Sequence, residues 1–438
     1  MVNQKVLLVN LLTAGAVLCS IGTANPLDPT FGRNGVRDIE TAGVFDDLSP
    51  KAIAVQTDGT IVVAGSRRVS SNDQAFVSIL WQPNGFAQYN FGIDMFAGLE
   101  HDATSLALDR EGRIRVGGSV VLPIRTCDHI DRYTSYSFVS RFDSKGSIDT
   151  SFGPSGSFAG SALIQAPCAD VLDVLASVDA AGRTLVSSDV LDGGVTSIVV
   201  TRLSEDGKID SSFGTSGQIR MQAPAGDSLA AAGLATSKSG EVFVGANQTS
   251  SIDGSVKGSV FKFRSDGNPD STFGAGGAVV VDLSSASERL CCMAVDGQGR
   301  TYIAGTSNEE FAFIARLTPA GQFDAKFGTH GVAFMSVGTS DSPAALALDA
   351  SDRANVTLTS YGLHSGATAI ELLHFNEDGS LNFATGESGI YEQSCGFIDC
   401  TAAGLAVDAF GRPTMVVASP DNGTFVLRED ELFADGCD

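Results

Sequence analysis

The residues with the most chemical potential in this sequence lie in one irregular stretch, from residue 122 to residue 136. Within it, His129 stands between Asp128 and Asp131, and neighbouring carboxylates can orient an imidazole as a general base or a metal ligand. The candidate ligand-binding residues of this stretch are Arg125, Asp128, His129, Asp131, Arg132, Tyr133 and Tyr136. The alternative is a solvated loop that a disulfide at Cys127 would hold.

Charged residues that recur along the chain form a second group. A basic residue recurs near the end of successive apolar runs, at Arg141, Arg202, Lys262, Arg316, His374 and Arg428. Such residues could face an anionic ligand together, or each could pair with the aspartate that follows it. Pairing is favoured, because a lone buried cation is costly.

Recurring aspartates are predicted to cap turns, because a residue repeated in every unit is distributed around the molecule instead of gathered in one pocket. They are Asp28, Asp149, Asp210, Asp270 and Asp324 in one position, and Asp109, Asp179, Asp296, Asp349 and Asp408 in another. No His-Glu-x-x-His, Gly-x-Ser-x-Gly, phosphate-loop or calcium-loop motif is present. We therefore expect no catalytic residue, no cofactor and no metal site.

The cysteines of an exported chain are interpreted first as disulfides. Cys127 and Cys168 are predicted to lie in loops on one face of neighbouring repeat units, which favours a bridge between units. Cys395 and Cys400 share a loop and are predicted to pair locally. The adjacent Cys291 and Cys292 could form a vicinal disulfide or remain buried thiols, and the pairing of Cys437 stays open.

A recurring six-residue phrase indicates the elements that position these residues. It reads Leu27-Asp28-Pro29-Thr30-Phe31-Gly32 at its first occurrence, and its phenylalanine returns at Phe152, Phe213, Phe273 and Phe327. Degraded copies place Phe91 and Thr385 in the same position, so successive copies are 54 to 61 residues apart. Between copies lie short apolar or β-branched runs separated by Gly- and Asp-containing turns, which indicates about four strands per unit.

The expected fold is all-β: a seven-bladed β-propeller built from four-stranded repeats of ~60 residues. A linear β-solenoid is the alternative. Since the last unit stops after Arg428, the amino-terminal copy is expected to complete the final sheet. The expected divisions are a signal peptide at 1–24, the propeller at 25–430 with units near 31–90, 91–151, 152–212, 213–272, 273–326, 327–384 and 385–428, and a short acidic tail at 431–438.

Three recurring motifs together resemble the delta-60 repeat family. They are the Phe-Gly phrase, the Asp-x-x-Gly-Arg turn at Asp179–Arg183 and Asp408–Arg412, and the Arg-x-x-x-Asp-Gly element at Arg202–Gly207. The resemblance extends from about Leu27 to Arg428. It implies a β-propeller fold and says little about the ligand.

The amino-terminal segment and the charge balance set the expected location. Lys5, the apolar stretch from Val6 to Ile21 and the small residues before Ala24 predict a secretory signal cleaved after Ala24. A lipid anchor at Cys19 is the less favoured alternative, because the bulky Leu18 precedes it. The formal net charge of −23 argues against nucleic acid and anionic lipid as partners. We expect a secreted or periplasmic monomer with no membrane span.

The expected function is that of a non-catalytic scaffold that binds a protein or glycan across the face carrying the 122–136 loop. One alternative is an extracytoplasmic hydrolase or lyase with His129 and Asp131 as its acid-base residues. The other is a structural component of the cell envelope or surface.

Overall fold

A computed structural model describes residues 27–39, 48–69, 72–81, 87–92, 99–122, 134–153, 161–165, 170–224, 226–283, 287–308, 310–335, 341–361, 368–383, 389–394, 399–419 and 423–430. The regular elements of this described part are all strands. In chain order they are β1 (Val36–Asp38), β2 (Leu48–Val55), β3 (Ile61–Val69), β4 (Asn72–Trp81), β5 (Ala87–Gly92), β6 (His101–Leu108), β7 (Ile114–Leu122), β8 (Thr134–Phe142), β9 (Ser161–Gln165), β10 (Asp170–Val178), β11 (Thr184–Asp192), β12 (Val195–Leu203), β13 (Gln218–Met221), β14 (Ser228–Thr236), β15 (Val242–Thr249), β16 (Val256–Phe263), β17 (Ala278–Val280), β18 (Glu288–Val295), β19 (Thr301–Ser307), β20 (Phe311–Leu317), β21 (Val332–Met335), β22 (Ser342–Leu348), β23 (Ala354–Tyr361), β24 (Thr368–His374), β25 (Ile390–Ser394), β26 (Thr401–Val407), β27 (Pro413–Ser419) and β28 (Gly423–Arg428).

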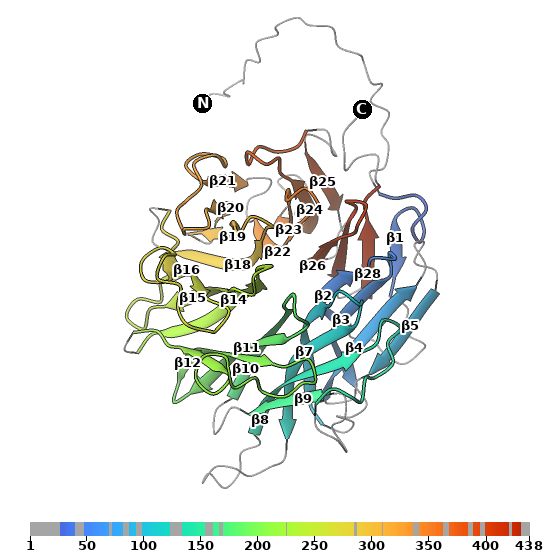
Figure 1. Cartoon of the computed structure of the whole chain (residues 1–438). Coiled ribbons are helices and arrows are strands. Elements are labelled where there is room, and N and C mark those ends of the chain that lie inside the picture. The colour runs from blue at the N-terminus through green and yellow to red at the C-terminus, as the bar shows by residue number, and fades with distance from the viewer. Residues whose placement is uncertain are drawn as a thin grey trace, which may run out of the picture.

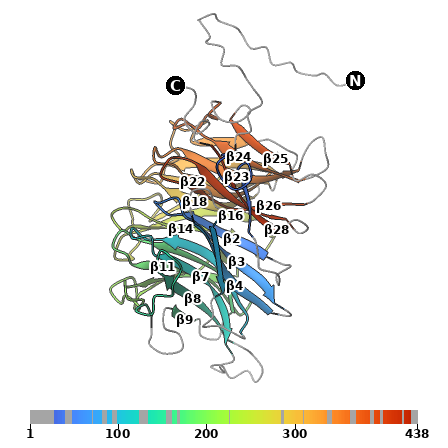
Figure 2. The same cartoon turned by 90° about the vertical axis from the view of Figure 1, so that its right-hand side faces the viewer.

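These strands form six hydrogen-bonded sheets set around a common centre (Figure 1). Five sheets have four strands: β2–β5, β6–β9, β10–β13, β22–β25, and β26–β28 with β1. The sixth has eight strands, β14–β21. Figure 2 turns this arrangement by 90° and brings β2–β4 and β7–β9 toward the viewer.

The all-β, propeller-like arrangement agrees with the sequence prediction, but the predicted set of seven separate four-stranded blades is wrong. Strands β14–β17 and β18–β21 join in one sheet, because Lys257 and Glu288 form a parallel bridge between β16 and β18. The Lys257 ammonium also lies 2.6 Å from the Glu288 carboxylate. Gly258 permits the approach, since a Cβ atom there would lie 2.7 Å from Cγ of Leu290. The repeat count therefore does not give the sheet count.

The inner strands close a ring. Each contacts the next in the order β2, β6, β10, β14, β18, β22 and β26, and β26 contacts β2. The ring is completed at the chain ends, where β1 pairs with β28 through Val36 and Leu427. The N–H of Asp28 donates to the carbonyl of Arg428 at 2.9 Å. The prediction that the amino-terminal copy completes the last sheet is confirmed.

The strand after a Phe-Gly phrase is the outermost strand of the preceding sheet. For example, β9 pairs with β8, whereas the sequence units count it as the first strand of the unit that follows. The phrase itself binds the next unit: the N–H of Gly153 donates to the carbonyl of Asp206 at 2.9 Å. Gly207 has φ +80°, and a Cβ atom there would lie 2.5 Å from the Gly153 nitrogen. Gly153 also has a positive φ, of 77°, so glycine is favoured at both positions where consecutive units meet.

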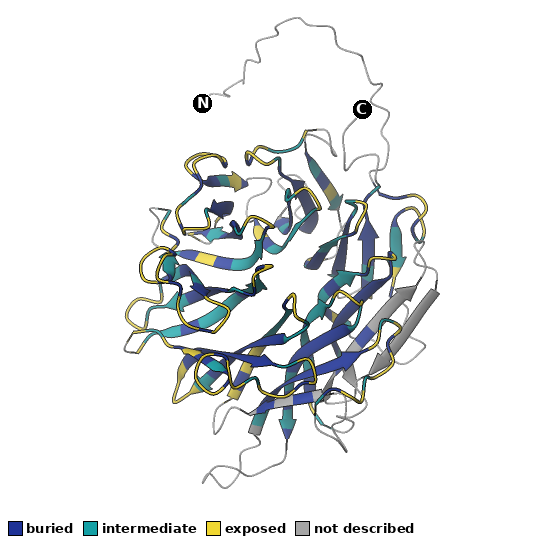
Figure 3. Cartoon of the chain, in the orientation of Figure 1, coloured by how far each residue is buried: buried dark blue, intermediate teal, exposed yellow. Residues whose placement is uncertain are grey.

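Apolar side chains fill the space between neighbouring sheets. Val62 of β3, for instance, belongs to the same buried cluster as Val116 of β7 and Phe138 of β8. The middle strands are accordingly the most deeply buried (Figure 3). A sheet covered on both sides favours β-branched residues without strict alternation, as in the sequence.

The two faces of the ring differ in their connections. We call "loop face" the face at which the second strand of each sheet ends and the inner strand begins; β7 ends there at Leu122, and β8 begins there at Thr134. The opposite "turn face" carries the Asp-x-x-Gly turns and the Phe-Gly phrases. Each inner strand has a β-bulge near its loop-face end, and bulges redirect the side chains beside them. The bulges lie between Pro50 and Ala52, Ala103 and Ser105, Val171 and Asp173, Ala231 and Gly233, Leu290 and Cys292, Pro343 and Ala345, and Ala402 and Gly404.

Candidate functional site

The predicted ligand-binding loop falls almost entirely outside the described residues. This applies to Arg125, Asp128, His129, Asp131, Arg132 and Tyr133. Tyr136 is described: it lies within β8, opposite Val120, and is 8% exposed in the core cluster that also contains Leu122. The loop begins and ends at the paired residues Leu122 and Thr134, so its root is fixed at the edge of the loop face.

The repeated basic residues are buried and paired, which confirms the structural interpretation of that pattern. In five units the cation meets the phrase aspartate at 2.7 to 3.0 Å: Arg141–Asp149, Arg202–Asp210, Lys262–Asp270, Arg316–Asp324 and Arg428–Asp28. The Arg202 guanidinium also lies 4.4 Å from the centre of the Phe213 ring. Hydrogen bonds from Ser212, together with the charge of Arg202, lower the pKa of Asp210. These charges therefore hold consecutive units together.

The second set of recurring aspartates caps turns, also as predicted. Asp109 Oδ1 accepts from the N–H groups of Glu111 and Arg113, and its Oδ2 pairs with Nε of Arg113 at 2.7 Å. The same arrangement recurs at Asp179, Asp296, Asp349 and Asp408. The turn face thus uses its repeated charges in its own structure.

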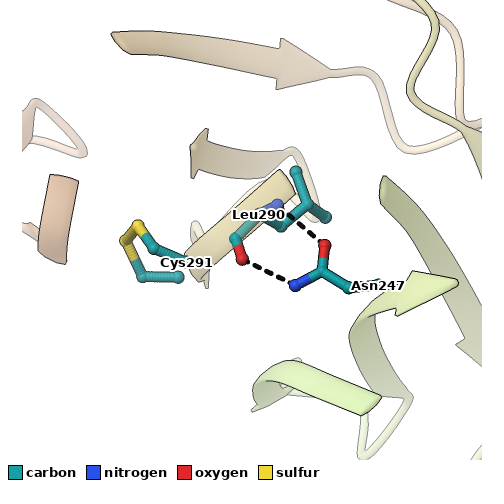
Figure 4. The surroundings of a disulfide bond; sticks show 4 residues. Asn247, Leu290 and Cys291 are labelled. Carbon is teal, nitrogen blue, oxygen red and sulfur yellow. Dashed lines mark hydrogen bonds between the residues drawn. A yellow bond between two sulfur atoms is a disulfide. The ribbon is translucent and has the colours of Figure 1, made fainter. Parts of the chain in front are cut away.

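A further inter-unit contact lies near the loop face and was missed in the sequence. The contact is made by the sixth residue of the second strand of a sheet, which in β15 is Asn247. The Asn247 amide donates to the carbonyl of Leu290 and accepts from the N–H of Leu290, both at 2.8 Å (Figure 4). In the same position of β23, Thr359 accepts from the N–H of Ala402 at 3.1 Å. These side chains satisfy backbone groups exposed beside the bulge of the next inner strand.

Asp189 occupies this position in β11 and is a buried carboxyl group at the loop face. Its two carboxylate oxygens accept from the N–H of Ala231 at 2.9 and 3.0 Å, and the side chain is 4% exposed. Asp173, which is exposed, lies directly opposite on β10. Burial raises the pKa of Asp189 to about 7, the Asp173 charge adds to the rise, and the Ala231 N–H opposes it. Alignment of the repeats would have found it, because the other units carry an amide, a hydroxyl or, at Ala418, a methyl group in this position.

The Asp173–Asp189 pair lies beside the root of the predicted loop. Ser188, which precedes Asp189, has its hydroxyl oxygen 2.6 Å from that of Ser137, one residue after Tyr136 in β8. Two carboxyl groups in different environments can supply an acid and a base. The loop-face end of β10 and β11 is therefore the candidate site of the described structure.

Side chains around the rest of this rim differ from unit to unit. The exposed or half-buried residues near the start of other inner strands include Lys51, Asp102, Arg289, Ser342 and Thr401. Toward the turn face the same strands carry Ala, Leu, Val and Met, as in Met293-Ala294-Val295. The side chains at the loop-face rim vary among units, whereas the Asp-containing turns of the turn face are alike. Function in repeat proteins concentrates where the units vary.

The adjacent cysteines form a vicinal disulfide, Cys291–Cys292, at the bulge of β18 (Figure 4). Cys400 is buried and disulfide-bonded, to a partner outside the described residues. Cys127, Cys168 and Cys395 also lie outside them. The pairs Cys127–Cys168 and Cys395–Cys400 thus remain predictions.

Two features are absent from the described residues. Over those ranges, no group of three or more His, Cys, Asp or Glu residues is placed to hold a metal ion. Nor does the described chain contain a helix with the length and apolarity to cross a membrane.

Comparison with known proteins supports a β-propeller repeat and a propeller fold. Residues 238–273, from the β14–β15 turn to Phe273, match the family described as "Domain of unknown function (DUF5122) beta-propeller". This supports a β-propeller repeat. None of the curated proteins matches the chain.

Solved structures share the fold at low identity. A polysaccharide lyase of family PL25, an ulvan lyase bound to -[GlcA(1-4)Rha3S]-, has 10% identity and a TM-score of 0.55, with coverage of 89% of this chain and 95% of its own. Polysaccharide lyase Uly1 has 10% identity and a TM-score of 0.51, with coverage of 90% and 91%. The intramolecular trans-sialidase from Ruminococcus gnavus also has 10% identity, with a TM-score of 0.42 and coverage of 91% and 97%.

Proposed function

We propose that this protein is an exported, non-catalytic scaffold that binds a glycan at the loop-face rim. One observation carries the proposal: the turn face uses its repeated charges in ion pairs and caps, whereas the side chains at the loop-face rim vary among the units. Exposed Lys51, Asp173 and Arg289 supply donors and acceptors of both charges. A polar rim of this kind suits a hydroxyl-rich ligand.

The choice of a glycan over a protein has separate support. Two solved structures that resemble this chain at TM-scores of 0.51 and 0.55 are polysaccharide lyases. The proposal also includes the delta-60 name for the repeat, the 1–24 signal peptide and the seven expected repeat units. The 123–133 loop, with Arg125, His129 and Asp131, would extend the binding surface beside Asp173.

A glycan array probed with the purified mature chain tests this function. We expect binding that weakens at least about tenfold, or about 1.4 kcal/mol, in Asp173→Ala and Lys51→Ala. Arg264→Ala is the matched control, because Arg264 is an exposed cation of the turn between β16 and β17. Failure of every glycan to bind, or loss of binding only in the control, would contradict the proposal.

A lyase or hydrolase is the second candidate, and the raised pKa of Asp189 beside Asp173 is the observation that favours it. A carboxyl group that burial keeps protonated near neutral pH can serve as a general acid. Release of reducing or unsaturated ends from the array's best ligand would be measured for the natural chain, Asp189→Asn, His129→Ala and Asp131→Ala. Turnover that disappears in these variants while binding is retained would replace the scaffold with an enzyme. No turnover in any of them supports the scaffold.

A further inference from the structure

The inner strand β18 carries a disulfide at a position where the other inner strands carry none. Each inner strand has a β-bulge, and in β18 the extra residue of the bulge and the residue after it are Cys291 and Cys292, which are bonded to each other. In the inner strands on either side, the equivalent pairs are Ala232-Gly233 and Ala344-Ala345. Those strands form the same bulge without a covalent bond, so the bulge itself does not require the cysteines.

We expect this disulfide to contribute little to the stability of the whole chain. A disulfide stabilises a folded protein mainly by restricting the unfolded chain, and the restriction grows with the number of residues that the bond encloses. The bond between Cys291 and Cys292 joins neighbouring residues and encloses no other residue. Its effect is therefore expected in the chemistry of the two sulfur atoms and in the backbone next to them.

Cys291 and Cys292 are more accessible than the other disulfide-bonded cysteine of the described residues. Both are half-buried, whereas Cys400 is 1% exposed. Exposed disulfides exchange with thiols more readily than buried ones, because the attacking thiolate must reach a sulfur atom. The bond between Cys291 and Cys292 should therefore be reduced before the bond of Cys400.

The backbone beside the disulfide contacts both neighbouring units. On one side, the Asn247 amide of the preceding unit donates to the carbonyl of Leu290 and accepts from its N–H. Figure 4 shows the disulfide on the other side of the β18 backbone from Asn247. There both cysteines pack against a buried cluster that includes Val356 of the following unit. Because the carbonyl of Leu290 belongs to the peptide bond with Cys291, a change at the disulfide acts directly on backbone that Asn247 holds.

We propose that Cys291 and Cys292 form a redox-reactive site that controls the backbone at the loop-face end of β18, with a dithiol as the reductant. One thiolate of the dithiol attacks a sulfur atom of the pair, the S–S bond breaks, and the other cysteine leaves as a thiolate. The second thiolate of the dithiol breaks the mixed disulfide. The dithiol is oxidised to a disulfide, and Cys291 and Cys292 become thiols with the two protons that the dithiol loses. Release of the bond frees the backbone at Leu290 and at the rim residue Arg289, whether or not the rim binds a glycan.

The test compares the natural chain with the double variant Cys291→Ala and Cys292→Ala, which gives β18 the Ala-Ala pair of β22. Both chains are treated with increasing dithiothreitol in the absence of denaturant. Free thiols are alkylated with iodoacetamide and identified by mass spectrometry, and hydrogen exchange of the Leu290 amide is measured in parallel. In the natural chain we expect Cys291 and Cys292 to be labelled before Cys400, and exchange of the Leu290 amide to accelerate by at least about tenfold.

The double variant is the control, because exchange of its Leu290 amide should not respond to the reductant. Equal acceleration in both chains would assign the effect to another disulfide and overturn the proposal. Labelling of Cys291 and Cys292 only together with Cys400 also overturns it, as does their reduction without a change in Leu290 exchange. The order of labelling is measured in the natural chain, so it decides the result even if the double variant does not fold. No glycan is used, so failure here leaves the proposed function intact.

Discussion

The sheet region β18–β21 and the sheet β22–β25 follow each other around the ring, yet they fill the same space beneath the Phe-Gly phrase in two ways. In the first, Arg316 is 1% exposed, pairs with Asp324 and lies 4.9 Å from the centre of the Phe327 ring. In the second, Nδ1 of His374 lies 2.7 Å from Oδ1 of Asn355, and its Nε2 lies 2.9 Å from the carboxylate of the buried Glu429. Cation, anion and aromatic partner change together.

The cation, the aspartate and the aromatic residue change together because a buried charge without its partner is costly. A buried ion with its partner removed is strongly unfavourable, whereas replacement of both partners can be nearly neutral. A unit can therefore leave the ion-pair pattern only by several coordinated substitutions. The unit with Leu80 likewise lacks both the cation and the aspartate, and single substitutions in the regular units should be severe.

The largest expected effect is that of Arg316→Ala. It leaves the Asp324 carboxylate without its cation and removes the bonds to Tyr302 and to the carbonyl of Glu377. We expect the free energy of unfolding to fall by about 3–5 kcal/mol, measured by chemical denaturation. Arg264→Ala is the control, because Arg264 is 60% exposed and 3.9 Å from Asp266; its effect should stay below about 0.5 kcal/mol. Equal losses in the two variants would contradict a structural role for the buried pair.

The regular units were also the part that the sequence predicted best. The Phe-Gly phrase, the ion pairs and the closure through β1 follow from local periodicity and from the cost of unpaired buried charge. The merged eight-stranded sheet does not, because it depends on how closely Gly258 lets β16 approach β18. Asp189 and Glu429 carry no motif, and only comparison of equivalent positions shows that each places a carboxylate where other units do not.

The substitution Asp189→Asn gives β11 the residue type that Asn247 provides in the same position of the next unit. The pKa of Asp189 is about 7 in the folded protein, above the value of about 3.9 in an unfolded chain. The folded state therefore binds the proton more tightly, and stability should fall as pH rises from about 4 to about 7. An amide removes this dependence. We expect Asp189→Asn to increase the free energy of unfolding by about 2–4 kcal/mol at pH 8.5 and to have little effect at pH 4.

Denaturation across pH 4 to 9 provides the measurement. Asp192→Asn, at the exposed end of the same strand, is the control and should leave the pH profile unchanged. A profile for Asp189→Asn that keeps the slope of the natural chain would show that Asp189 ionises normally. It would also remove the acid-base argument for an enzyme.

The smallest expected effect on the free energy of unfolding is that of Asn247→Ala, and the comparison is Thr306→Ala. Thr306 holds the same position in β19. Asn247→Ala leaves the buried N–H and carbonyl of Leu290 without their side-chain partner, so the free energy of unfolding should fall by about 1–3 kcal/mol. Thr306 faces a different neighbour: the residue before the bulge of the next inner strand is Pro343, which has no N–H to satisfy. Thr306→Ala should therefore cost less than about 0.5 kcal/mol, although both residues occupy one position of the repeat. Equal costs for the two substitutions would mean that this position stabilises the ring by packing alone, and that the hydrogen bonds between units contribute little.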